Sequence, residues 1–156
     1  MTQNEIPPAA QQEAVALAAR TGARLVINAA PAPESPPPWY GAADPLVVNE
    51  HEAAQLTTSD ETGAELLRRL RERTGARSVV MTLGERGALV DDGTEVHAIP
   101  PVVVEQVVDA TGAGDTFVGV LAARLARGDA VVAAASAANR CAAKAVTWSG
   151  ARPLAG

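Results

Sequence analysis

The residues from Val108 to Phe117 read V-D-A-T-G-A-G-D-T-F and combine two glycines with an acid where a helix is expected to begin. Gly112 and Gly114 free the backbone to bend and let a ligand approach it closely. The first turn of the following helix offers unpaired amide N–H groups and the positive end of the helix dipole, which together bind anions. Asp115 would lie beside such an anion, where a carboxylate can take a proton from an attacking hydroxyl group. The run therefore predicts a phosphate site with a neighbouring general base.

A helix start of this kind also has a purely structural explanation, in which an acid caps the helix and no ligand is bound. Capping needs only one acid, however, whereas here Asp109 precedes the Gly-x-Gly bend and Asp115 follows it. Because a glycine bend at a helix start is well suited to anions, the sequence favours the ligand site over capping alone.

Other candidate residues follow two further expected strands or lie on the last expected helix. Asn49 and Glu52 have the spacing of a helix capping box, which does not exclude a role in ligand binding. The segment T-L-G-E-R-G at residues 82–87 is explained by a plain turn with glycines at positive φ, so its glycines alone are weak evidence for a ligand. Asn139 is the candidate on the last helix.

The composition limits the classes of protein to which the chain can belong. Of its 156 residues, 47% are hydrophobic and 20% are charged, as in a folded globular domain. Only 3% are aromatic, so the core must be built from Ala, Val and Leu, which suits close packing of helices on a sheet. A formal charge of -5 argues against a nucleic-acid partner, because phosphate contacts need a basic surface.

Disulfides, histidine metal sites and membrane spans receive no support from the sequence. Cys141 is the only cysteine, which excludes a disulfide within the chain. His51 and His97 share no metal-ligand spacing with other residues and are interpreted as surface residues. No stretch approaches the roughly eighteen apolar residues that a membrane span needs, and the first residues lack a targeting pattern. These observations predict a cytoplasmic protein without a membrane partner.

Apolar periodicity, prolines and glycines predict an alternation of helices and strands. Helices are expected at residues 7–21, 50–56, 60–74, 113–126 and 130–146, and strands at residues 24–28, 46–48, 78–82, 88–90, 95–99 and 102–108. The prolines of residues 31–38 predict a stiff loop without regular structure. The order predicts an α/β fold of three α-β-α layers, with a mainly parallel sheet and an antiparallel hairpin at one side. Ligands bind at the carboxyl ends of the strands in such sheets, where most of the candidates fall.

Taken together, these motifs resemble the carboxyl-terminal half of the ribokinase-like, or phosphofructokinase B, family of carbohydrate kinases. The string D-A-T-G-A-G-D-T-F closely resembles that family's signature D-T-x-G-A-G-D with a downstream aromatic residue. Weaker matches follow in the family's order: N-E-I-P at the start, I-N-A-A-P-A at 27–32, V-N-E-H-E at 48–52, M-T-L-G-E-R-G at 81–87 and A-V-T-W-S-G-A-R-P at 145–153. The second and the last of these look most like the ribokinase branch of the family.

The resemblance implies transfer of a phosphoryl group from ATP to a sugar hydroxyl, with conversion of ribose to ribose 5-phosphate as the expected reaction. It implies that Asp115 is the base that deprotonates the sugar hydroxyl. The amides of Gly112, Ala113 and Gly114 would form an anion hole for the moving phosphoryl group.

The resemblance also implies that the chain binds ATP, Mg²⁺ and K⁺. Asn49 and Glu52 match the family's Asn-x-x-Glu, which organises the magnesium ion and the phosphates, chiefly through water. Nucleotide contacts are implied for Thr82, Gly84, Gly87 and Asn139, the last beside the adenine. A potassium ion is implied near Asp109 and Thr111, with backbone of residues 146–150.

A member of this family is about twice as long, and its first half supplies the sugar-binding residues and a lid over the sugar. The resemblance therefore makes residues 1–156 a single nucleotide-binding and catalytic part, truncated on its N-terminal side. One expectation is a partial sugar kinase that needs a missing N-terminal half or association with further copies of the chain. The alternative is a nucleotide-binding remnant or assembly module that transfers no phosphate, since positioning makes most of the catalysis.

Overall fold

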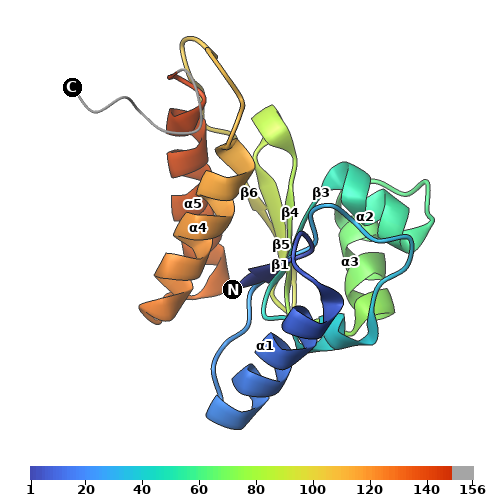
Figure 1. Cartoon of the computed structure of the whole chain (residues 1–156). Coiled ribbons are helices and arrows are strands. Elements are labelled where there is room, and N and C mark those ends of the chain that lie inside the picture. Colours follow the sequence, from blue (N-terminus) through green and yellow to red (C-terminus); the bar gives the residue numbers. More distant parts are fainter. Residues whose placement is uncertain (149–156) are drawn as a thin grey trace.

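The computed structural model describes residues 1–148, which form a six-stranded sheet between two sets of helices (Figure 1). The strands lie side by side in the order of the sequence: β1 Thr2–Gln3, β2 Ile27–Asn28, β3 Leu46–Asn49, β4 Val79–Thr82, β5 Ala88–Asp91 and β6 Val96–Ile99. β1 to β4 are parallel, whereas β4, β5 and β6 pair antiparallel. The predicted α/β class, with three layers and a mainly parallel sheet, is confirmed.

The helices of the described residues cover both faces of the sheet. They are α1 Pro8–Thr21, η1 Pro38–Ala42, α2 Glu50–Thr57, α3 Gly63–Thr74, η2 Gly84–Arg86, α4 Ala113–Ala126 and α5 Val131–Ala145, of which η1 and η2 are short 3₁₀ helices. α1 to α3, η1 and η2 connect strands, whereas α4 and α5 follow β6. In Figure 1, α2 and α3 lie on one face, and α4 and α5 lie on the other. Within residues 1–148, no helix is both long and apolar enough to cross a membrane.

The strands supply side chains to two separate cores, because successive residues of a strand point to opposite faces. Leu46 and Val48 of β3 pack with the leucines of α2 and α3. Val47, between them, packs on the other face with Phe117 and Leu121 of α4 and with the alanines of α5. Burial on both faces explains why the parallel strands are continuous apolar runs. The core is built from Ala, Val and Leu with few rings, as the composition predicts.

The proline-rich loop ends in a turn that closes over the core. Residues 31–37 contain neither helix nor strand, and η1 follows them. Tyr40 is fully buried, and its hydroxyl group accepts a hydrogen bond of 2.7 Å from Asn4 Nδ2. Trp39 Nε1 donates to Gln11 Oε1 at 3.0 Å, which joins the turn to α1. The stiff loop expected from its prolines is therefore fixed at its end by two aromatic side chains.

Three expectations about strands differ from the structure. The strand expected at residues 24–28 is reduced to Ile27–Asn28, which is β2. β1 was not expected, because Thr2–Gln3 is short and carries no apolar pattern, yet it pairs in parallel with β2. The strand expected at residues 102–108 is wrong, because this segment is an irregular loop in which Val103 is 92% exposed. Its valines favour extended backbone, but the preceding Pro100 and Pro101 have no amide N–H to continue the pairing of β6.

Hydrogen bonds between polar side chains link the segments that precede β2, β3 and β4. Arg24, before β2, donates from Nε to Asp44 Oδ2 and from Nη2 to Oδ1, both at 3.0 Å. Ser78, before β4, donates its hydroxyl hydrogen to Asp44 Oδ1 at 2.7 Å. Burial by itself would raise the pKa of Asp44, but the hydrogen bonds from Arg24 and Ser78 outweigh it and lower that pKa. The ionised carboxylate therefore stabilises the fold.

We expect Asp44→Asn to lower the free energy of unfolding by about 1–3 kcal/mol at neutral pH, because the hydrogen bonds from Arg24 and Ser78 to a charged acceptor are weakened or lost. The pKa of Asp44 is lower in the folded state, so its stabilisation is present above the unfolded value of about 3.9 and is lost as the pH falls through the folded value. Urea unfolding of both proteins across this range should show their stabilities converging at acid pH. Asp60→Asn, at an exposed position, is the control. A constant difference at all pH values would contradict the assignment.

Candidate functional site

Three polar side chains end three neighbouring parallel strands at the same edge of the sheet. Asn28 ends β2, Asn49 ends β3 and Thr82 ends β4, and Asn49 and Thr82 are direct partners in the strand register. A pocket of about 200 Å³ opens at this edge between β2–β4, α2 and the start of α4. It is lined by Asn28, Ala30, Val47, Val48, Asn49, Glu52, Thr82, Gly112, Gly114, Asp115 and Val118. We refer to it as the acidic pocket, because it contains the side chains of Glu52 and Asp115.

The start of α2 forms one wall of the acidic pocket. Asn49 Oδ1 accepts the Glu52 amide N–H at 2.8 Å, and Glu52 Oε2 accepts the Asn49 amide N–H at 2.7 Å. The capping box predicted from the sequence is thus present, and both of its residues also line the pocket. Burial raises the pKa of Glu52, and the hydrogen bond from the Asn49 backbone opposes this effect. The two residues are therefore already oriented by the fold before any ligand binds.

The start of α4 forms the opposite wall. Gly112 is the N-cap residue with φ 77°, a left-handed conformation that favours glycine, and the helix begins at Ala113 as predicted. The Thr116 amide makes the first bond of the helix, to the Gly112 carbonyl at 2.9 Å. The Ala113 amide donates to the Ala110 carbonyl at 3.2 Å. Gly114 and Asp115 are exposed at the pocket, where the first turn of a helix attracts anions.

A second pocket of about 400 Å³ adjoins the first, and the two share Thr82 and Gly114. Its lining is mostly valine, alanine and glycine, so we refer to it as the apolar pocket. It is lined by Thr82, Gly84, Glu85, Gly87, Val102, Val104, Val107, Ala110, Ala113, Gly114, Phe117, Asn139, Ala142, Ala143 and Val146. The pockets therefore form one continuous site along the carboxyl ends of the strands and the start of α4.

Most of the residues selected from the sequence lie in this combined site. Asn49, Glu52, Gly112 and Asp115 line the acidic pocket, Gly84, Gly87, Ala113 and Asn139 line the apolar pocket, and Thr82 and Gly114 line both. Asp109 and Thr111 are not among the lining residues; Asp109 Oδ1 accepts the Thr111 amide N–H at 2.8 Å and shapes the loop before α4. The backbone of residues 149–150, also expected near a potassium ion, lies outside the described residues.

Asn28 is a polar residue of the acidic pocket that was not selected from the sequence. It lies at the end of a parallel strand, as Asn49 and Thr82 do, and that position was the signal available for finding it. It lacks the Asn-x-x-Glu spacing of Asn49 and the neighbouring glycines of the 82–87 and 112–115 segments, so no local motif marks it.

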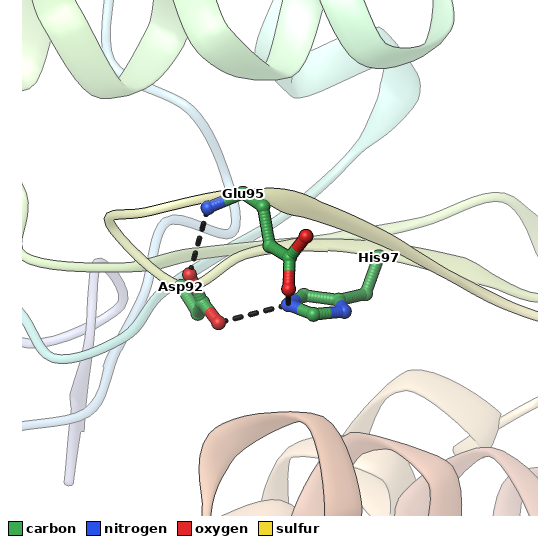
Figure 2. A group of neighbouring side chains, drawn as sticks. All are labelled: Asp92, Glu95 and His97. Carbon is green, nitrogen blue, oxygen red and sulfur yellow. Dashed lines mark hydrogen bonds and ion pairs between the residues drawn. The ribbon is translucent and has the colours of Figure 1, made fainter.

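A separate group of ionisable side chains lies at the β5–β6 turn (Figure 2). His97 Nε2 lies 2.8 Å from Asp92 Oδ2 and 3.6 Å from Glu95 Oε1. Asp92 Oδ1 accepts the hydroxyl and amide hydrogens of Thr94 and the amide hydrogen of Glu95, and these bonds lower the pKa of Asp92. The strand register places this turn beside the first residue of β4, at the opposite end of the sheet from the pockets. These hydrogen bonds hold the β5–β6 turn together, which explains why the three side chains lie close to one another.

The fold is that of ribokinase-like kinases. Ribokinase from Thermotoga maritima superposes with a TM-score of 0.82 at 28% identity, and the match covers 96% of this chain and 50% of that one. A ribokinase of Arabidopsis thaliana, complexed with ribose and ATP, gives a TM-score of 0.86 at 25% identity and covers 96% and 49% of the two chains.

Sequence comparison agrees with the fold. Residues 1–155 match the pfkB family of carbohydrate kinases, and the chain belongs to that family. Ribokinase of Mus musculus is 40% identical over 129 residues, which are 80% of this chain and 40% of that protein. Ribokinase of Schizosaccharomyces pombe is 31% identical over 155 residues, or 96% of this chain and 49% of that protein. The chain thus spans about half the length of the curated relatives that it matches.

The two glycines of the 84–87 turn differ in what a side chain would meet. A Cβ atom at Gly87 would lie 2.2 Å from the Ile99 carbonyl oxygen and 3.0 Å from the backbone of Pro100 and Pro101. A Cβ atom at Gly84 would meet no atom within 4 Å. Both glycines have positive φ, 61° at Gly84 and 90° at Gly87, so replacing either one strains the backbone. Only the replacement of Gly87 also brings a side chain into collision with neighbouring backbone.

We therefore expect Gly87→Ala to lower the free energy of unfolding by about 3 kcal/mol or more, because the Ile99–Pro101 backbone must move. Gly84→Ala carries only the left-handed strain and should cost about 1–2 kcal/mol. Urea unfolding of the two matched variants measures the difference. Equal stabilities would show that the 84–87 turn does not pack against the segment after β6.

Proposed function

We propose that this chain is the nucleotide-binding and catalytic part of a sugar kinase that transfers the γ-phosphoryl group of ATP to a hydroxyl group of ribose. The observation that carries the proposal is the junction of the two pockets at Thr82 and Gly114. One pocket holds carboxylates beside a helix start, and the other offers an apolar wall of the kind that covers a flat base. The Arabidopsis thaliana ribokinase complexed with ribose and ATP supports the assignment of both ligands.

In this proposal Asp115 takes the proton of the sugar hydroxyl group while the hydroxyl oxygen attacks the γ-phosphorus. The new oxygen–phosphorus bond forms as the bond from that phosphorus to the oxygen bridging to the β-phosphate breaks, and ADP leaves. The amides of Gly112, Ala113 and Gly114 stabilise the negative charge on the transferred group. The Ala113 amide exchanges its 3.2 Å bond to the Ala110 carbonyl for a bond to the phosphoryl oxygen.

The apolar pocket takes the adenine and ribose of ATP. Thr82, which lines both pockets, contacts the phosphates together with Gly84 and Gly87, while Asn139 borders the base. The pocket volume of about 400 Å³ lies within the range of small-molecule sites in proteins, roughly 300–1,000 Å³. This agreement supports a complete nucleotide site within the chain.

The residues of the acidic pocket fit a magnesium ion that accompanies ATP. Mg²⁺ takes oxygen ligands and keeps several waters, and Glu52 and Asn49 present carboxylate and amide oxygens that the capping box has already oriented. When bound, the ion neutralises charge on the phosphates. For potassium, the candidates are Asp109 and Thr111, whose loop leads directly into the anion hole.

The sugar would be held largely by residues that this chain does not contain. The chain spans about half the length of its relatives, so an N-terminal half or an associated copy of the chain is the proposed source of the remaining walls. Free ribose and ATP as substrates support a cytoplasmic location, and the net charge of -5 gives no support to a nucleic-acid partner.

A second candidate function is a nucleotide-binding module without transferase activity. The observation that favours it is the same half length, because phosphoryl transfer depends chiefly on positioning both substrates. In this case the chain binds ATP in the apolar pocket but has no acceptor alcohol beside Asp115. The two candidates differ in one respect that is measurable: whether the Asp115 carboxylate affects ATP turnover.

We expect Asp115→Asn to reduce ribose phosphorylation by about 10²–10⁴-fold, because the amide cannot accept the hydroxyl proton. The assay measures ADP formed from ATP in the presence of ribose, Mg²⁺ and K⁺. The affinity for MgATP should stay within about threefold of the unchanged protein, since the carboxylate is replaced by a group of the same size. Equal turnover by both forms would remove Asp115 from the mechanism. ATP binding by both forms without any turnover would support the second candidate.

We expect Glu52→Gln to raise the Mg²⁺ concentration needed for half-maximal ATP binding by about tenfold, because a charged group that orients the ion's waters is lost. Gln keeps an oxygen that can accept the Asn49 amide N–H, so the capping box and the thermal stability should be preserved. Glu50→Gln is the matched control, because Glu50 pairs with Arg86 and does not line the acidic pocket. An unchanged magnesium requirement in Glu52→Gln would exclude Glu52 from the metal site.

A further inference from the structure

The loop of residues 100–110 forms one side of the apolar pocket but packs little against the rest of the protein. Val102, Val104, Val107 and Ala110 line the pocket from this loop. Val103 is 92% exposed and Val107 is 62% exposed, so buried apolar area does little to hold the segment in place. The loop also has no strand or helix hydrogen bonds of its own. Its position must therefore depend on specific attachments.

The hydrogen bonds that attach the loop lead to α5 and its C-cap. At one end, Asn139 Nδ2 donates to the Pro100 carbonyl at 2.9 Å. At the other end, the amides of Val108 and Asp109 donate to the Val146 carbonyl at 2.8 and 3.2 Å. Asn139 and Val146 are about two helical turns apart on the same helix and its cap. The loop is thus fastened at both ends to one side of the pocket.

Asn139 has a chemical reason to bind the loop. The segment leaves the sheet at Pro100 and Pro101, which have no amide N–H groups, so it cannot continue the ladder of β6. The Pro100 carbonyl is therefore outside the strand ladder and accepts the Asn139 N–H instead. Asn139 is only 9% exposed and is the buried polar side chain of α5, where its buried neighbours include Ala135 and Ala138. A buried amide at this position is accounted for by the carbonyl that it satisfies.

The attachment also affects the neighbouring turn. The backbone at Gly87 lies so close to Ile99 and Pro100 that a Cβ atom would collide with them. A displacement of Pro100 would therefore move the 84–87 turn as well as the loop valines that line the apolar pocket. Asn139 thus acts at the point where two sides of the apolar pocket meet.

From these contacts we infer that Asn139 is a positioning residue, which shapes the nucleotide pocket by holding the 100–110 loop and does not select the base. The inference rests on the proposed function only in taking the ligand of the apolar pocket to be a purine nucleotide. An amide that reads an adenine edge must present a donor and an acceptor together, but here one of the two Asn139 N–H groups is bonded to Pro100 and the residue is only 9% exposed, which leaves little of the amide for a base. The loop and α5 otherwise line the pocket with valines and alanines, which cover either purine alike.

The test compares Asn139→Ala and Asn139→Asp with the unchanged chain, using MgATP and MgGTP as separate probes in titration calorimetry. Asp has the size of Asn, but its carboxylate cannot donate to the Pro100 carbonyl. Both variants should weaken ATP and GTP binding by the same factor, about tenfold, so that the ratio of the two affinities stays constant within about twofold. Ser136→Ala is the matched control on the same helix, because the Ser136 hydroxyl bonds only to the Val132 carbonyl and does not line the pocket.

A second measurement needs no nucleotide and follows the loop directly. Hydrogen exchange of the Val108 and Asp109 amides, which donate to the Val146 carbonyl, should become about fivefold faster or more in both Asn139 variants, and remain unchanged in Ser136→Ala. Faster exchange together with failure of the unchanged chain to bind either nucleotide would uphold the anchoring role and refute the proposed function. Unchanged exchange, or an altered ratio of ATP to GTP affinity, would overturn the inference.

Discussion

The parallel register of β2, β3 and β4 is the constraint on which the rest of the site depends. Because the three strands point the same way, their last residues Asn28, Asn49 and Thr82 share one edge of the sheet. Parallel strands need crossover connections, and those of this chain, with α1, η1, α2 and α3, pack on one face of the sheet. α4 and α5, which follow β6, cover the other face, so the parallel strands are apolar on both sides. The chain can then place polar groups only where a strand ends. The acidic pocket lies at this edge because burial excludes polar side chains from the strands themselves.

The second face of the sheet determines the shape of the apolar pocket. Ala134, Ala135 and Ala138 of α5 are completely buried against α4 and the strands, and small side chains allow backbones to approach closely. α5 therefore lies near enough to the sheet edge for one of its side chains to reach the chain as it leaves β6. A bulkier helix at this position would move the 100–110 loop away from the 84–87 turn, and the two sides of the apolar pocket would separate.

The class of fold and most of the helices could be predicted from the sequence, because apolar periodicity and glycines that end helices are local signals. The sequence was insufficient where pairing is decided by distant residues. β1 consists of Thr2–Gln3, and only its neighbour β2 makes it a strand. The valines of residues 102–108 have the composition of a strand, but the preceding Pro100 and Pro101 interrupt the backbone pairing and the segment is an irregular loop. In the same way, the Asn49–Glu52 capping box was visible as a spacing, whereas the shared pocket with Asn28 and Asp115 depends on the sheet register.

The two pockets differ in how complete they are, which separates the nucleotide side of the proposed reaction from the acceptor side. The apolar pocket, at about 400 Å³, reaches the size of ordinary ligand sites, and its described sides all come from this chain. The acidic pocket, at about 200 Å³, falls below that range although it contains the proposed base. A phosphoryl acceptor must be held on the side of Asp115 away from the nucleotide for in-line attack. In the proposed reaction the missing volume therefore lies on the acceptor side, so the proposal treats binding of ATP and transfer of its phosphate as separable.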